Sequence, residues 1–130
     1  MAVVDHVGWV VRSLDAARPH FETNLGLAFC GEEAFPGLRI AFFGEGSTQL
    51  EVLEPVDEGS AMGAFLASHG EGVHHLALRV DDVGAALAEA TRNGLKLVDQ
   101  APRPGSRGTI VGFVDPGRPD GILIQYVQRP

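Results

Sequence analysis

The chain has 130 residues, of which 45% are hydrophobic and 21% charged, and its formal net charge is −7. The length and composition fit one compact soluble domain, while the acidic balance argues against a nucleic-acid partner. No apolar run is long enough to span a membrane, the N-terminus lacks the layout of a signal peptide, and a single cysteine favours the reducing environment of the cytoplasm.

The first part of the chain predicts a strand, a helix and three further strands. Val3–Val11 has apolar residues at both parities, as expected of a strand covered on both faces. Ser13 is a suitable N-cap for a helix that runs to about Asn24, and Pro19 should kink this helix or shorten its start. The three strands are expected at Ala28–Glu32, Leu38–Phe43 and Gln49–Leu53.

The second part repeats this plan after a short connecting helix, Ser60–His69. A strand is expected at Val73–Val80, and a helix at Val83–Arg92 with Asp82 as its cap. Further strands are expected at Leu95–Asp99, Thr109–Val114 and Ile122–Val127, whereas the loop over residues 102–108 is too rich in glycine and proline to be regular.

The pattern therefore predicts an α+β fold made of two strand–helix–strand–strand–strand modules. We expect a single domain over residues 1–130, with module 1 at about 1–57, the connector at about 58–70 and module 2 at about 71–130. Each module would leave one sheet face uncovered, so the two modules should curl together around that face.

The two halves also carry similar residues at equivalent places. His6 lies ten positions before Ala16, and His75 lies ten positions before Ala85. The last strand of the first half reads Glu51-Val52-Leu53-Glu54-Pro55, and the last strand of the second half reads Gln125-Tyr126-Val127-Gln128. By this alignment His6 corresponds to His75, and Glu51 corresponds to Gln125.

These four residues predict one metal site between the two copies. Imidazole nitrogens and carboxylate oxygens suit divalent ions, and Gln125 would add a neutral amide oxygen. The structural alternative is that the histidines are hydrogen-bonded core residues and that Glu51 faces solvent. His74 points to the other face of its strand from His75, so we interpret it as structural.

Several stretches together resemble the vicinal oxygen chelate superfamily, the glyoxalase/bleomycin-resistance/extradiol-dioxygenase group. They are DHVGWVV, FPGLRIAFF, QLEVLEP, GEGVHHLALRVDDV, APRPGSRGTIVGFVDP and GILIQY, and they run in family order over nearly the whole chain. Within this superfamily the chain looks most like the methylmalonyl-CoA epimerases.

The resemblance implies two tandem βαβββ modules that form a U-shaped, partly open mixed β-barrel around a metal cleft. It implies one divalent ion (Co, Zn, Ni, Mn, Fe or Mg) held by His6, Glu51, His75 and Gln125. It further implies a homodimer, no membrane partner, and a carbonyl or acyl-CoA-like substrate. We expect Arg39, Gln49 and Arg103 to contact that substrate.

The chain departs from the family at the last ligand, where a glutamate that also acts as a base is replaced by Gln125. An amide does not accept a proton near neutral pH, and Ile40 stands where some epimerases carry an acid, so the catalytic base is left unassigned. The first hypothesis is a metal-dependent epimerase, isomerase or lyase that stabilises an enolate. The alternatives are a binding protein that sequesters small molecules, as bleomycin-resistance proteins do, and a lyase similar to glyoxalase I.

Overall fold

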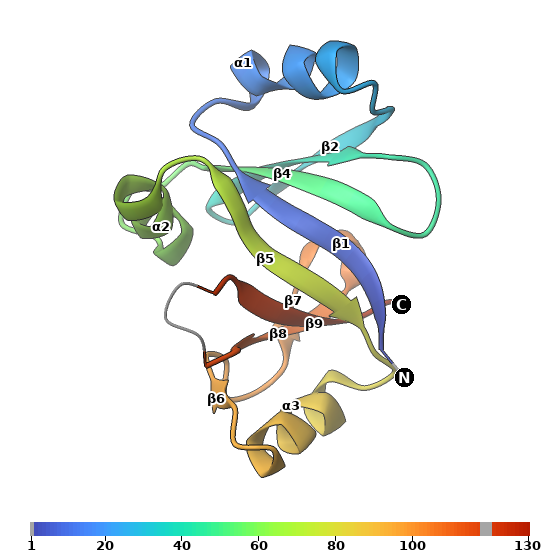
Figure 1. Cartoon of the computed structure of the whole chain (residues 1–130), viewed down its shortest axis with the longest axis vertical. Helices are drawn as coiled ribbons and strands as arrows, with labels where there is room; N and C mark the ends of the chain where they lie inside the picture. The colour runs from blue at the N-terminus through green and yellow to red at the C-terminus, as the bar shows by residue number, and fades with distance from the viewer. Residues whose placement is uncertain (1, 118–120) are drawn as a thin grey trace. The chain divides into compact units, whose positions relative to one another are not determined.

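The computed structural model describes residues 2–117 and 121–130, which form nine strands and three α-helices (Figure 1). The predicted α+β fold class is confirmed. The chain divides into two compact units: the first is His6–His74, and the second combines the N-terminal residues up to Asp5 with His75–Pro130. Among the described residues, no helix has both the length and the hydropathy that a membrane span requires.

The first unit is built on four strands in the order β2-β3-β4-β1. They are β1 (Val3–Val10), β2 (Phe29–Phe35), β3 (Leu38–Phe43) and β4 (Gln49–Pro55). β1 pairs in parallel with β4, and the other two pairings are antiparallel. β2 extends past its predicted end at Glu32, because its pairing with β3 continues to the turn at Pro36 and Gly37.

Two helices cover opposite faces of these strands. α1 (Leu14–Pro19) is capped by Ser13, whose hydroxyl accepts a hydrogen bond from the Ala16 N–H at 3.2 Å. The helix is followed by a π-helical turn, His20–Asn24, so the disturbance predicted at Pro19 is confirmed. The α1 face has a core around Leu14, Phe21, Phe43 and Val52, whereas α2 (Ala61–His69) covers a core around Val10, Ile40, Phe42 and Leu53 (Figure 1).

The second unit repeats the same arrangement. Its elements are β5 (Gly72–Arg79), α3 (Val83–Arg92), β6 (Lys96–Leu97), β7 (Arg103–Pro104), β8 (Ile110–Asp115) and β9 (Leu123–Gln128). The strand order is β5-β9-β8-β6, with β5 parallel to β9, and β7 also pairs with β8.

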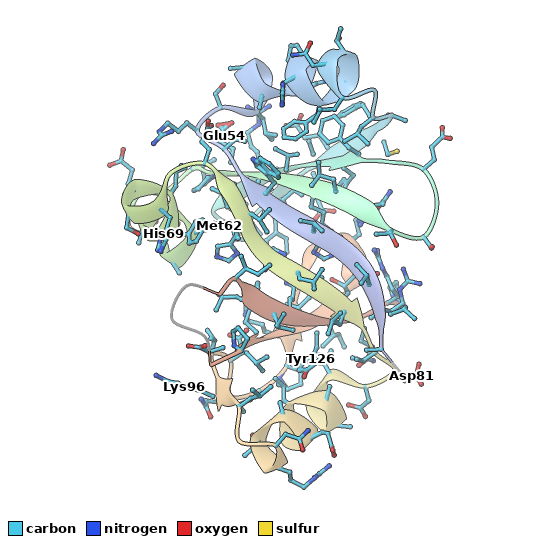
Figure 2. All side chains as sticks on the ribbon, in the orientation of Figure 1. Glu54, Met62, His69, Asp81, Lys96 and Tyr126 are labelled. Atoms are coloured by element: carbon cyan, nitrogen blue, oxygen red, sulfur yellow. The ribbon has the colours of Figure 1, made fainter. Side chains whose placement is uncertain are left out.

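α3 packs its apolar side on the strands of this unit. Asp82 caps the helix, and the buried side chains of Val83 and Leu87 join a core with Val114. Tyr126 belongs to the same core and lies between β9 and α3 (Figure 2). Gly112 allows this close approach, since a Cβ atom there would lie only 3.0–3.2 Å from side-chain atoms of Leu87 and Val83.

The region before β8 differs from its prediction. The loop over residues 102–108 was expected to be irregular, and that prediction is wrong, because it holds β7 and a 3-10 turn at Ser106–Gly108. Pro104 suits a short outer strand, because proline has no N–H to offer to a further neighbour. β6 is shorter than predicted, because the N–H groups of Val98 and Asp99 both donate to the carbonyl oxygen of Phe113.

Candidate functional site

The first unit brings two of the predicted ligands together. β1 and β4 run in parallel, with Gly8 opposite Glu51, so His6 and Glu51 lie two residues apart in register. His6 Nδ1 is 3.3 Å from Glu51 Oε2, and the two side chains are only 5% and 6% exposed. Glu51 is therefore not a solvent-facing edge residue, and its register partner Gly8 carries no side chain.

Apolar side chains surround this pair on the same face of the sheet. Phe42 is the register partner of Glu51. Val10 lies four residues beyond His6 and is paired with Leu53, two residues beyond Glu51, so both are on the same face. These residues belong to the core that α2 covers. Because they exclude water, they strengthen the attraction between the carboxylate and any bound cation.

The second unit places the other two predicted ligands in the same relationship. β5 and β9 are parallel, with His75 opposite Leu123 and Ala77 opposite Gln125. His75 is 3% exposed, and its ring meets that of Phe113 edge to face, with the centroids 5.2 Å apart. Phe113 is in turn the register partner of Gln125.

The two units therefore share the same strand register around the predicted ligands. Gly8 opposite Glu51 corresponds to Ala77 opposite Gln125, and Phe42 opposite Glu51 corresponds to Phe113 opposite Gln125. We did not predict the two phenylalanines from the sequence. Their signal is weak, since one stands in Ala-Phe-Phe-Gly and the other in Gly-Phe-Val-Asp.

The side-chain oxygen of Gln125 is an unusual feature of the second unit. Gln125 is 8% exposed, and its Oε1 has no hydrogen-bond partner within the described residues. A buried amide oxygen without a partner is costly, and such groups are rare in folded proteins. An amide oxygen, a carboxylate and two imidazoles form a donor set that fits a divalent ion, so the residues present fit the predicted cofactor.

Asp5, which directly precedes His6, has a structural role. Its carboxylate is fully buried and accepts hydrogen bonds from Arg129 Nε and Nη2 at 2.9 and 2.8 Å, and from Arg79 Nε at 2.9 Å. These contacts tie the start of β1 to β5 and to the end of the chain within the second unit. The sequence alone did not indicate this ion cluster.

His74 also has a structural environment. It is buried, and its ring packs edge to face on Phe65 of α2, with the centroids 4.8 Å apart. Burial, with a smaller contribution from His69, lowers the pKa of His74 to about 4. The imidazole is therefore neutral at neutral pH.

The structure does not bring Arg39 to the face that carries His6 and Glu51. Arg39 is the register partner of Glu54, so it lies on the α1 side of the sheet. Its guanidinium binds Glu32, Asp15 and Glu54 at 2.8, 3.2 and 3.3 Å, and hydrogen bonds to Asp15 and Glu32 raise its pKa. Three acidic partners hold this arginine, so its geometry does not favour the predicted contact with substrate.

The other two residues predicted to contact substrate lie nearer to the candidate ligands. Gln49 is opposite His6, on the face of Glu51, and its Nε2 donates to the Gly44 carbonyl at 3.1 Å. Arg103 lies on β7, and its guanidinium carbon is 5.5 Å from the centroid of the Phe113 ring.

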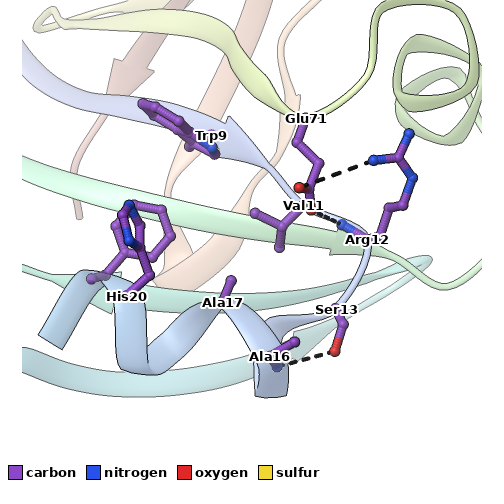
Figure 3. A pocket seen from close by; sticks show the side chains of 9 residues that line it. Trp9, Val11, Arg12, Ser13, Ala16, Ala17, His20 and Glu71 are labelled. Carbon is purple, nitrogen blue, oxygen red and sulfur yellow. Dashed lines mark hydrogen bonds and ion pairs between the residues drawn. The ribbon is translucent and has the colours of Figure 1, made fainter. Parts of the chain in front are cut away.

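A pocket of about 370 Å³ lies between β1 and the α1 region (Figure 3). It is bounded by Trp9, by Ala17 and His20 of the α1 region, and by Glu71, which accepts a hydrogen bond from the Arg12 N–H at 2.8 Å. Trp9 is three residues from His6 along the strand, so the two side chains point to opposite faces. This pocket is separate from the predicted metal ligands.

Comparison with known proteins supports the relationship inferred from the motifs. The model of the Glyoxalase/Bleomycin resistance protein/Dioxygenase superfamily matches residues 5–113. The uncharacterized protein YqjC of Bacillus subtilis is 34% identical over 127 residues, which cover 96% of this chain and 91% of that protein. The ethylmalonyl-CoA/methylmalonyl-CoA epimerase of Cereibacter sphaeroides is 29% identical over 129 residues, with 96% of each protein covered.

A solved structure of a methylmalonyl-CoA epimerase in complex with methylmalonyl-CoA and NH4+ aligns with a TM-score of 0.90. The identity is 32%, and the alignment covers 99% of this chain and 95% of the other. The predicted vicinal oxygen chelate fold and the predicted relationship to the epimerases are therefore confirmed. The chain belongs to the glyoxalase/bleomycin resistance protein/dioxygenase superfamily.

Proposed function

We propose that the protein is a metal-dependent enzyme of the epimerase, isomerase or lyase type that acts on an acyl-CoA-like substrate. One divalent ion would be held by His6, Glu51, His75 and Gln125. The observation that carries the proposal is the buried Oε1 of Gln125, which has no partner among the described residues and occupies the position that corresponds to Glu51 in the other unit. The similarity to the epimerases supports an acyl-CoA-like substrate.

The ion and the residues around it would have different roles in the reaction. When bound, the ion supplies a Lewis acid that stabilises negative charge on the carbonyl oxygen of the substrate. Glu51 contributes the formal negative charge of the ligand set, and Gln125 contributes a neutral oxygen. Phe42 and Phe113, next to Glu51 and Gln125 in register, would keep water away from the substrate.

Gln125 cannot take the proton from the α-carbon, because an amide has no useful basicity near pH 7. The proton acceptor must therefore be another group, and a two-base mechanism with a base at position 125 does not apply to this chain. We include lyases and isomerases in the proposal for this reason, alongside epimerases.

The first experiment is to purify the protein without a chelator and to measure bound metal by mass spectrometry. We expect about one equivalent of a divalent ion per chain in the wild type and in His69→Ala, which removes an exposed histidine of α2. His75→Ala should lose the ion. The metal-loaded protein should then exchange the α-proton of methylmalonyl-CoA in heavy water.

Sequestration of a small molecule is the second candidate function, and the replacement of a basic glutamate by Gln125 favours it. A wild-type protein that is free of metal and binds apolar ligands without turning them over would support sequestration and would contradict the enzyme proposal. Equal metal content in the wild type and in His75→Ala would also contradict it.

A further inference from the structure

We propose that Arg103 recognises an oxyanion of the substrate and that Asp99 is the positioning residue that holds Arg103 for this purpose. The ligand class is an acyl thioester that carries a carboxylate or phosphate group. The inference rests on the proposed function, because it places Arg103 beside a candidate metal ligand. All residues in the argument belong to the second unit.

Asp99 fixes both Arg103 and the strand that faces it. Its Oδ1 accepts a hydrogen bond from Arg103 Nε at 3.0 Å, and its Oδ2 accepts one from the Phe113 N–H at 2.8 Å. The Asp99 N–H donates to the Phe113 carbonyl at 3.0 Å. The Asp99 side chain is only 18% exposed, so this carboxylate is a fixed anchor rather than a solvated surface group.

The anchor brings Arg103 over an aromatic ring that touches a predicted ligand. The guanidinium carbon of Arg103 lies 5.5 Å from the Phe113 centroid, within the range of a cation–π contact. Phe113 also contacts His75, and the two rings meet edge to face with their centroids 5.2 Å apart. Arg103 is therefore one aromatic ring away from His75, which places its charge at the margin of the candidate site.

The terminal nitrogens of Arg103 are available to a ligand. Asp99 uses only Nε, and across residues 2–117 and 121–130 the two terminal nitrogens make no hydrogen bond. Arg39 differs, because three carboxylates occupy its guanidinium. A planar pair of N–H donors with a free edge matches the two oxygens of a carboxylate or a phosphate.

The oxyanion has two possible sources within one substrate: the carboxylate of a malonyl-type acyl group and the phosphates of coenzyme A. Three probes separate them. Methylmalonyl-CoA has both groups, propionyl-CoA lacks the acyl carboxylate, and methylmalonyl-pantetheine lacks the nucleotide phosphates. Binding of each to the metal-loaded protein is measured by titration calorimetry, in the wild type and in Arg103→Gln.

Arg103→Gln should lower the affinity for methylmalonyl-CoA about 10- to 100-fold, which is the range expected when a hydrogen bond to a charged group is lost. A parallel loss with methylmalonyl-pantetheine and none with propionyl-CoA would assign Arg103 to the carboxylate. A parallel loss with propionyl-CoA and none with the pantetheine would assign it to phosphate. Either outcome supports the inference.

Arg18→Gln is the matched control. Arg18 also lies over a ring, 3.6 Å from the Phe29 centroid, and its Nε also binds a carboxylate, that of Glu22. Arg18 belongs to the first unit, and its ring partner Phe29 packs against Phe43 in the core on the α1 side. Its removal should leave all three affinities unchanged, and an equal loss in Arg18→Gln would overturn the inference as a general effect of charge.

Asp99→Asn tests the positioning role. It should lower the affinity for the same probes as Arg103→Gln does. The double variant should bind those probes no more weakly than Arg103→Gln alone. Losses that add, or that affect all three probes equally, would indicate a merely structural Asp99. Circular dichroism checks that the variants fold, and if Asp99→Asn does not fold, Arg103→Gln alone decides.

Two results would overturn the inference outright. One is equal affinity of the wild type and Arg103→Gln for every probe, and the other is a wild-type protein that binds none of them. Neither result affects the metal content of the wild type and His75→Ala, which tests the proposed function separately.

Discussion

His6 Nδ1 and Glu51 Oε2 lie 3.3 Å apart, and both side chains are buried. Glu51 carries the only formal negative charge among the four predicted ligands, so most of the attraction for a cation depends on it. We predict that Glu51→Gln lowers the affinity for a divalent ion by at least about 100-fold, since even outer-shell changes at metal sites cost 10- to 100-fold. Competition with a chromophoric chelator measures this.

Glu54→Gln is the control for that change. Glu54 stands on the same strand but on the α1 side, where it binds Arg39 and accepts a hydrogen bond from the Leu14 N–H. This variant should keep wild-type metal affinity. Equal losses in Glu51→Gln and Glu54→Gln would show that the effect comes from overall charge and would contradict a ligand role for Glu51.

Gln125→Glu should change the protein in opposite directions with and without metal. Without metal, the new carboxylate is buried at a position where the amide oxygen has no described partner, so the free energy of unfolding should fall by about 1–3 kcal/mol. With metal, the added negative charge should raise affinity about tenfold or more. Thermal unfolding with EDTA, and then with Co²⁺ or Mn²⁺, measures both effects.

Gln100→Glu, at an exposed position of the same unit, is the matched control and should show neither effect. If Gln125→Glu left both the unfolding temperature in EDTA and the shift produced by metal at wild-type values, Gln125 would not line a metal site.

The repeat in the sequence predicted the strand faces that carry the candidate ligands better than local motifs did. The spacing from His6 to Ala16 equals that from His75 to Ala85, and this identified two copies. The structure gives the two copies the same strand register. Strand alternation then placed Glu51 on the His6 face and Gln125 on the His75 face. These inferences succeeded because a parallel strand pair with one buried face has little freedom of register.

The features missed depend on contacts between residues far apart in sequence. Asp5 is bound by Arg129, 124 residues later, and no local pattern marks that pair. Arg39 was predicted to contact substrate, yet three acidic residues from other elements surround it. Phe42 and Phe113 became recognisable only when the register joined them to Glu51 and Gln125.

His74 should make the metal-free protein less stable as the pH falls. Its pKa is about 4 when folded and about 6.5 when unfolded, so between these values the unfolded chain binds more protons. The stability from a neutral His74 is complete above pH 7 and falls by up to about 3 kcal/mol on approaching pH 4. Urea unfolding in EDTA at pH 7, 6 and 5 measures the loss.

His74→Gln should flatten this pH dependence relative to the wild type, because it removes the titrating group beside Phe65 and His69. His20→Gln removes an exposed histidine and should leave the wild-type profile intact. If stability depended on pH in the same way in the wild type and in His74→Gln, burial of His74 would not be the cause of the loss of stability at acidic pH.

The ion cluster at Asp5 should contribute more to stability than any exposed ion pair among the described residues. Asp5→Asn would leave Arg79 and Arg129 facing a neutral group in a position closed to solvent on the aspartate side. Breaking a buried ion pair by removing one partner typically costs 3–5 kcal/mol. Because the two arginine side chains are 35% and 28% exposed, we expect a loss near the lower end, about 3 kcal/mol.

Glu22→Gln is the reference for that comparison, since Glu22 forms an exposed pair with Arg18 one helical turn away. Such pairs contribute about 0.3–0.5 kcal/mol, so the urea midpoint should hardly move. Asp5→Asn should lower the midpoint strongly and should do so at high salt as well, because a buried pair is poorly screened. If 1 M salt abolished the difference between Asp5→Asn and the wild type, the carboxylate would behave as a surface charge, and it would not be the anchor that ties the start of β1 to β5 and to the end of the chain.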